Sequence, residues 1–245
     1  MRSMTIIAAA LLLFASGLAR AQDVPATAPP PGGATTPSAA DTATPPPAAA
    51  TPASSQPANP AMTGPQILIS TAMGDITLQL DSVRAPKSVA SILRYVKDRH
   101  YNGTVVYRVV KGFAIQMGSW DANVKGRPGH APSPLEANNG LSNLRGTVAL
   151  AHGDDLMASA DFFINVADNT ALDHKADDSG NTTGFTVFGQ VTAGMDVVDA
   201  ISNVAVGDHG PMPGQAPVDP ILITKVSVVG EPDPAPAKAP AKKKK

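Results

Sequence analysis

Short apolar runs with strand-like character dominate the middle of the chain. Between residues 66 and 230 these runs are rich in Val, Ile, Phe and Thr, and they are separated by Gly, Asn, Asp or Pro. This pattern is typical of short strands joined by turns. We predict eight strands, at residues 66–70, 76–80, 105–110, 113–117, 147–152, 162–166, 186–191 and 221–229.

Two stretches depart from the strand pattern and favour helices. From residue 86 to 99 the apolar positions follow the i, i+3, i+4, i+7 spacing of an amphipathic helix, and Pro86 suits its first turn. These positions are Val89, Ile92, Leu93 and Val96. A shorter helix is predicted from about residue 193 to 201. Its buried side would carry Met195, Val198 and Ile201.

Many short strands and only two helices predict a mainly β protein. Exposed strand edges are costly, and closing a sheet on itself removes them. We therefore expect a closed or nearly closed eight-stranded antiparallel barrel at residues 66–230, capped by the two helices.

The segments on either side of this domain are biased in composition. Residues 1–21 combine an early positive charge, an apolar run and a small-x-small sequence, which is the pattern of a cleaved signal peptide and predicts export to the periplasm. The apolar run is shorter than the ~20 residues that a membrane-spanning helix needs, so we expect no stable membrane insertion. Residues 22–65, rich in Pro, Ala and Thr, and residues 231–245, rich in Lys, Pro and Ala, are expected to be disordered.

Composition and motifs exclude several classes of function. The chain has no cysteine, so it forms no disulfide, thiolate nucleophile or Cys-type zinc site. Its formal net charge of -1 argues against nucleic acid as a partner. We find no phosphate-binding glycine loop, serine-hydrolase elbow or zinc-protease motif, and the five histidines are scattered. We expect no metal and no cofactor.

An arginine and a glutamine within apolar strands remain as candidates for chemistry. Rotation about an X-Pro peptide bond breaks no covalent bond and faces a barrier of ~18–20 kcal/mol from amide resonance. A fixed cation can stabilise the twisted amide more than either planar form, and an arginine presents rigid donors for this purpose. Arg108 with Gln116 and neighbouring phenylalanines would suit such a reaction.

Five blocks of sequence resemble the cyclophilin-type peptidyl-prolyl cis-trans isomerases. They are YRVVKGFAIQ at 107–116, NNGLSNLRGTVALA at 138–151, FFINV at 162–166, LD at 172–173, and FTVFGQV at 185–191 followed by GMDVV at 194–198. The blocks occur in order over residues 66–230. The resemblance implies the cyclophilin-like barrel, with proline-containing unfolded or exported polypeptides as partners and a role in their folding. We expect a monomer.

The resemblance also implies roles for individual residues. Arg108 matches the catalytic arginine and Gln116 the glutamine that binds the substrate backbone. The matches to the walls and lining of the proline pocket are Phe113, Ala114, Phe163, Leu172 and Phe185. Ala151 and His152 fall where the family binds the residues before the proline through backbone groups. For the phenylalanines, ordinary core packing is the competing interpretation.

Departures from the family pattern keep a second interpretation open. Asp161 stands at a substrate-binding position that is usually glutamine, where it could pair with Arg108 and either orient the guanidinium or draw it away from substrate. Ala171 replaces a tryptophan common in eukaryotic members, which implies weak cyclosporin binding. The alternative to an isomerase is a proline-peptide-binding chaperone module of low or no activity on the same fold.

Overall fold

The computed structural model describes residues 58–153, 157–175 and 184–232. The expected signal peptide at 1–21 and most of the two biased segments, 22–65 and 231–245, lie outside these residues. Every structural statement below concerns the described residues.

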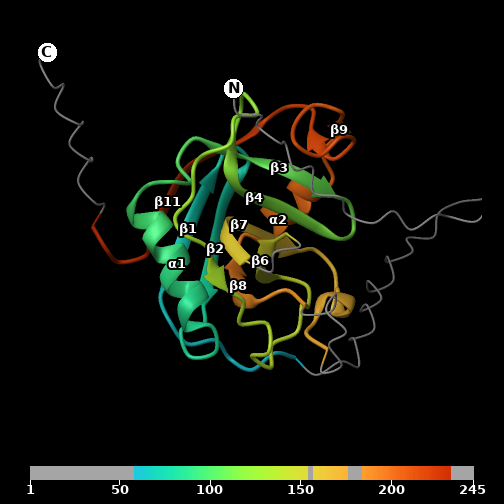
Figure 1. The fold of residues 1–245 in the computed structure, drawn as a ribbon. Helices are drawn as coiled ribbons and strands as arrows, with labels where there is room; N and C mark the ends of the chain where they lie inside the picture. The colour runs from blue at the N-terminus through green and yellow to red at the C-terminus, as the bar shows by residue number, and fades with distance from the viewer. Residues whose placement is uncertain (1–57, 154–156, 176–183, 233–245) are drawn as a thin grey trace, which may run out of the picture. The chain divides into compact units, whose positions relative to one another are not determined.

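Eight antiparallel strands form a closed barrel (Figure 1). Around the barrel the order is β4, β3, β11, β1, β2, β8, β6 and β7, and pairing of β7 with β4 closes the ring. The strands are β1 (Gln66–Thr71), β2 (Gly74–Leu80), β3 (Thr104–Val110), β4 (Ala114–Asp121), β6 (Thr147–His152), β7 (Met157–Asn165), β8 (Val187–Ala193) and β11 (Ile221–Val228). The sequence prediction of the barrel is confirmed.

The barrel interior is filled by aliphatic and aromatic side chains. Alternate residues of a strand point to opposite faces of the sheet, so every second residue enters this interior. The interior residues of the strands, together with buried residues of both helices, form one cluster that we call the barrel core. Its largest fully buried members include Phe162, Phe188, Ile115 and Met117.

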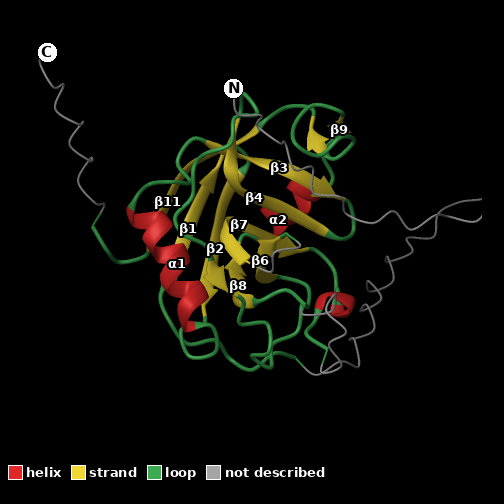
Figure 2. Cartoon of the chain, in the orientation of Figure 1, coloured by secondary structure: helices red, strands yellow, loops and turns green. Residues whose placement is uncertain are grey.

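Both predicted helices are present and contribute to the barrel core (Figure 2). Helix α1 (Pro86–Lys97) has Pro86 in its first turn and buries Val89, Ile92, Tyr95 and Val96. Helix α2 (Met195–Ser202) buries Val198 and Ile201. It begins after Gly194, whose φ of +85° places it in the left-handed region, and a Cβ at this position would collide with the carbonyl oxygen of Asp75.

The structure adds short elements that the sequence pattern did not predict. They are β5 (Ser133–Pro134), the 3-10 helix η1 (Thr170–Leu172), and the small hairpin of β9 (Val206–Gly207) and β10 (Ala216–Pro217). Strands β4 and β7 are also longer than predicted. Two- and three-residue elements carry too little periodicity to be recognised in a sequence.

Residues just before β1 contact the barrel, although they fall in the segment predicted as a linker. Backbone hydrogen bonds join Ser82 N to Thr63 O and Leu80 N to Pro65 O. The Met62 side chain is only 8% exposed. The packed domain therefore includes residues before position 66.

Among the described residues, no helix combines the length and apolar character needed to cross a membrane.

Candidate functional site

A second apolar cluster lies on the outer face of the barrel, over β4, β6, β7 and β8. Successive residues of each strand divide between the two clusters: Phe162 belongs to the barrel core and Phe163 to the second cluster. We call the second group the outer-face cluster. Its buried members are Met62, Ala114, Leu141, Ala149, Phe163 and Val187, and the partly buried Phe113, Ala151, Leu172 and Phe185 pack against them.

Six of the predicted site residues meet in this cluster: Phe113, Ala114, Ala151, Phe163, Leu172 and Phe185. Two aromatic contacts define one wall. The Phe163 and Phe185 rings meet edge to face with centroids 5.4 Å apart, and the His152 ring stacks on Phe185 at 4.4 Å. His152 Nε2 also lies 3.1 Å from the carbonyl oxygen of Gly184. The outer-face cluster thus joins segments that are far apart in the sequence.

A network of asparagines supports the partly exposed walls from beneath. Asn165 is fully buried and its Nδ2 donates to Asn143 Oδ1 at 3.2 Å. Asn169 Nδ2 donates to Asn165 Oδ1 at 2.7 Å and to the carbonyl oxygen of Phe113 at 2.9 Å. The backbone N–H of Asn143 donates to Asp173 Oδ1 at 2.6 Å. Because buried amides need partners, this network holds the Phe113 turn and the Leu172–Asp173 turn at fixed positions.

Arg108 lies beside the cluster on β3. Its register partner across β3 and β4 is Gln116, and Gln116 is in turn the partner of Phe163 across β4 and β7. Arg108 Nη1 donates to Gln116 Oε1 at 3.1 Å, and its Nε donates to Gln215 Oε1 at 2.5 Å. A guanidinium carries five N–H donors. Two are used here, so three have no acceptor among the described residues of the protein.

A β-bulge brings a further polar group to Arg108. Val106 pairs with Met117 and Arg108 with Gln116, so Tyr107 is the extra residue in β3. Gln116 Nε2 donates to the Tyr107 hydroxyl at 2.6 Å, and that hydroxyl also hydrogen-bonds the Asp161 carboxylate. The side-chain amide of Gln116 and the hydroxyl of Tyr107 therefore belong to one chain of hydrogen bonds.

Asp161 binds Ser119 and Tyr107 and forms no ion pair with Arg108. The Ser119 N–H donates to Asp161 Oδ1 at 2.9 Å, and the Ser119 hydroxyl donates to Oδ2 at 2.8 Å. The described ion pairs do not include one between Asp161 and Arg108. Tyr107 and Gln116 connect the carboxylate to the arginine.

Burial shifts the titration of these groups. It raises the pKa of the Asp161 carboxyl, and the hydrogen bonds from Ser119 and Tyr107 oppose that shift. It also raises the pKa of the Tyr107 hydroxyl well above its ordinary value, and the charge of Asp161 adds to this effect. Burial lowers the pKa of the Arg108 guanidinium, which still stays charged at neutral pH. Tyr107 therefore remains a hydroxyl that can donate to Asp161.

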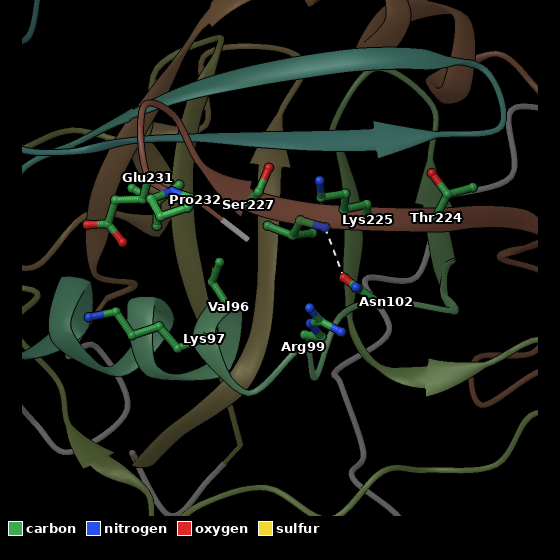
Figure 3. Close-up of a pocket in the computed structure, with 11 residues that line it drawn as sticks. Val96, Lys97, Arg99, Asn102, Thr224, Lys225, Ser227, Glu231 and Pro232 are labelled. Carbon is green, nitrogen blue, oxygen red and sulfur yellow. Dashed lines mark hydrogen bonds between the residues drawn. The ribbon is translucent and has the colours of Figure 1, made fainter. Parts of the chain in front are cut away.

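A separate cavity among the described residues lies away from the outer-face cluster (Figure 3). It has a volume of about 200 Å³ and lies between the end of α1 and β11, where Val96, Lys97 and Lys225 contribute to its lining. None of the predicted site residues lines it. Among the described residues, no three His, Asp or Glu side chains gather as a ligand set for a metal ion.

Sequence reasoning missed several residues that the structure brings to the site. Gln215 comes from the loop before β10, and no pattern in that Gly- and Pro-rich loop singles it out. Tyr107 stood inside the matched block, but its orientation depends on the bulge. Asn143 and Asn165 also lay in matched blocks without an assigned role. The available signal was a polar amide within an apolar block, since such a group needs a hydrogen-bond partner when it is buried.

Comparison with known proteins agrees with this geometry. The family described as "Cyclophilin type peptidyl-prolyl cis-trans isomerase/CLD" matches residues 66–228. Peptidyl-prolyl cis-trans isomerase A of Dickeya dadantii is 41% identical over 174 residues, covering 71% of this chain and 89% of the relative. Peptidyl-prolyl cis-trans isomerase B of Escherichia coli is 40% identical over 156 residues, covering 63% of this chain and 94% of the relative.

Solved structures show the same fold. A Cryptosporidium parvum cyclophilin-type isomerase superposes with a TM-score of 0.54 at 21% identity, covering 69% of this chain and 99% of that one. A second crystal structure of that protein, obtained in the presence of the dipeptide Ala-Pro, has the same TM-score of 0.54 and is 20% identical over 68% of this chain and 99% of its own. From the match over residues 66–228 and the relatives at about 40% identity, we conclude that the chain belongs to the cyclophilin-type peptidyl-prolyl cis-trans isomerases and is an enzyme of that activity.

Proposed function

We propose that the protein isomerises X-Pro bonds by stabilising the twisted prolyl amide with Arg108. The proposal rests on how the hydrogen-bond donors of the Arg108 guanidinium are used. Two of its donors are fixed by Gln215 and Gln116, while three have no protein acceptor among the described residues, beside an apolar cluster. Twisting the amide localises the lone pair of the prolyl nitrogen, so a preorganised cation interacts more strongly with the transition state than with either planar isomer.

The outer-face cluster would hold the proline ring. Phe113, Phe163, Leu172 and Phe185 offer apolar area around Ala114, whose small side chain leaves room over β4. Ala151 and His152 follow at the half-buried end of β6, where backbone groups would bind the residues before the proline.

Gln116 would contribute in two ways. Its Oε1 orients Arg108, and its Nε2 is held by the Tyr107 hydroxyl, so the amide cannot flip without losing both hydrogen bonds. It would also offer a polar contact to the substrate backbone. Asp161 would act as the far anchor of this chain of hydrogen bonds, which supports the orienting interpretation of that residue.

We further propose that the substrates are exported proteins that fold in the periplasm. The support is the signal-peptide pattern of residues 1–21. Uncatalysed X-Pro isomerisation takes roughly tens to hundreds of seconds, which is slow enough to limit folding.

The test is cis-trans exchange of an Ala-Pro-Phe peptide, measured by NMR with wild-type protein, Arg108→Ala and Arg108→Lys. We expect wild-type acceleration, at least a ~100-fold loss in Arg108→Ala, and only partial recovery in Arg108→Lys because a lysine lacks the planar donors. Arg127→Ala is the matched control, since Arg127 is also partly buried and its Nη1 donates to the carbonyl oxygens of His100 and Asn102, which are not members of the outer-face cluster. Equal acceleration by wild type and Arg108→Ala would contradict the arginine mechanism.

A further inference from the structure

A short segment ahead of the family match packs against the outer-face cluster. We call residues 59–63 the N-terminal strap; it lies in the first, blue part of the described chain in Figure 1. The family match begins only at residue 66. Three kinds of contact attach the strap: side-chain hydrogen bonds of Asn59, backbone hydrogen bonds of Ala61 and Thr63, and burial of Met62.

Met62 belongs to the cluster that contains the proline-pocket residues. It is 8% exposed, while Ala61 and Thr63 on either side are exposed. Its side chain joins the outer-face cluster with Phe163 and Leu141, and it does not belong to the barrel core. An unbranched thioether adapts to irregular space, which suits the back of a pocket whose front must admit a substrate.

Asn59 holds the loop that supports the pocket walls. Its Nδ2 donates to the carbonyl oxygen of Ser142 at 2.8 Å, and the Ser142 N–H donates to Asn59 Oδ1 at 2.9 Å. The side-chain amide thus binds both backbone groups of one residue. Ser142 stands between Leu141, a cluster member, and Asn143, which donates to Asp173 Oδ1 next to Leu172.

The same loop also reaches β8. Asn139 Nδ2 donates to the carbonyl oxygen of Val187 at 2.8 Å, and Val187 is a cluster member two residues after Phe185. Both partly exposed walls, Leu172 and Phe185, therefore rest on a loop that the strap fixes from outside. Walls that are not deeply buried depend on such supporting contacts for their position.

We propose that Asn59 and Met62 are positioning residues of the proline pocket, so that the functional unit of this enzyme begins at about residue 59. This inference rests on the proposed function of the outer-face cluster. Met62 fills the back of the pocket, and Asn59 fixes the 139–143 loop. The ligand is a polypeptide segment with an X-Pro bond, and loss of either contact weakens its binding and turnover.

The test compares Met62→Ala, Met62→Leu and Asn59→Ala in the full chain. For each protein, kcat and KM for Ala-Pro-Phe exchange, the dissociation constant of the peptide by NMR titration, and the melting temperature are measured. We expect Met62→Ala and Asn59→Ala to raise KM and the dissociation constant and to lower kcat/KM roughly threefold to tenfold, less than the ~100-fold cost of misplacing a reacting group. Met62→Leu, which restores the volume, should return both values to near wild type.

Two controls separate positioning from loss of stability. Ile201→Ala removes a fully buried barrel-core side chain in α2, and Thr63→Ala changes an exposed strap side chain. Ile201→Ala should lower the melting temperature and leave kcat/KM of the folded protein unchanged, and Thr63→Ala should change neither. The inference is overturned if Met62→Ala and Asn59→Ala lower only the melting temperature and keep the wild-type dissociation constant. Failure of the arginine mechanism would appear separately, as an active Arg108→Ala protein.

Discussion

The barrel core and the outer-face cluster are built from opposite faces of the same strands, yet they are held in different ways. In the core, side chains such as Phe162, Ile115 and Phe188 are at most 1% exposed and pack among the other buried residues of the barrel core. In the outer-face cluster, Phe113, Leu172 and Phe185 are partly exposed and rest on asparagine hydrogen bonds and on the strap. The strands thus provide a closed core on one face and, in the proposed function, a substrate surface on the other.

Because of this difference, substitutions on the two faces should be detected by different measurements. Burial of apolar area stabilises the core by about 25 cal/mol for each Å², so core substitutions should be seen first in the free energy of unfolding. The outer face keeps apolar area accessible, and substitutions there should be seen first in binding and turnover. Neighbouring residues of one strand can therefore be compared directly.

The largest expected effect comes from the adjacent pair in β7. Phe162→Ala should lower the free energy of unfolding by about 3–5 kcal/mol, because it leaves a cavity in the core. Phe163→Ala should cost less stability but lower kcat/KM by about tenfold or more, because it removes a wall of the proposed proline pocket. Chemical denaturation and peptide exchange on the same samples check both. Equal losses of activity in the two folded proteins would contradict the difference in function between the two faces.

Gln215→Ala should reduce turnover without a comparable loss of stability. It removes the acceptor of Arg108 Nε, so the guanidinium is held only by Gln116. We expect kcat to fall by about tenfold while the peptide dissociation constant changes little, since Gln215 orients the arginine and does not line the apolar cluster. Gln190→Ala, a partly buried glutamine of β8, is the control. If Gln215→Ala kept the wild-type kcat, the proposal that Gln215 orients Arg108 would be wrong.

The third prediction concerns the pH dependence of stability at Asp161. Burial raises its pKa above the ordinary value of 3.8, so the folded protein binds more protons than the unfolded chain between 3.8 and the raised value. In that window the carboxyl makes the free energy of unfolding fall as pH rises, and above it the contribution is constant.

Asp161→Asn removes this dependence. The free energy of unfolding of the variant minus that of the wild type should therefore grow as pH rises from about 3.8 and then level off. Lost hydrogen bonds to Ser119 add an offset that does not depend on pH. Urea denaturation at a series of pH values checks the slope, and a difference that stays flat or falls would contradict the burial of this carboxyl.

The smallest effect is expected at a surface ion pair. Asp199 binds Arg145 at 2.6 Å, and this hydrogen bond lowers the pKa of the Asp199 carboxyl. Both side chains are more than 40% exposed, at 46% for Arg145 and 43% for Asp199. Asp199→Asn should cost at most about 1 kcal/mol at neutral pH and less in high salt. The carboxylate contributes stability above pH 3.8 that is lost as the pH falls through its lowered pKa, opposite in sign to Asp161.

The sequence predicted the barrel because a short apolar run bounded by turn residues is a local property of each strand. All eight barrel strands could be located in this way, and both helices from their helical spacing of apolar residues. Alternation does not say which face encloses the core when both faces are apolar, as at Phe162 and Phe163. The resemblance to a known family assigned ten residues to one site, and the structure brings six of them together in the outer-face cluster.

What the sequence did not reveal depends on contacts over long separations. Gln215 lies 107 residues from Arg108, and the bulge at Tyr107 leaves no trace in the two-residue period. Asn59 and Met62 stand next to a Pro- and Ala-rich stretch whose composition predicts a linker, although their own contacts fix them to the domain. The composition of a segment does not reveal contacts that only one or two of its residues make.

The most direct test of the account is an NMR titration of the ¹⁵N-labelled protein with Ala-Pro-Phe. The account predicts that the amide shifts concentrate at Phe113, Ala151, Phe163, Leu172 and Phe185, with a change at the Arg108 Nε resonance. It also predicts little change at barrel-core residues such as Ile69 or Leu78. Shifts concentrated around the cavity lined by Val96 and Lys225, with none in the outer-face cluster, would contradict the assignment of the site.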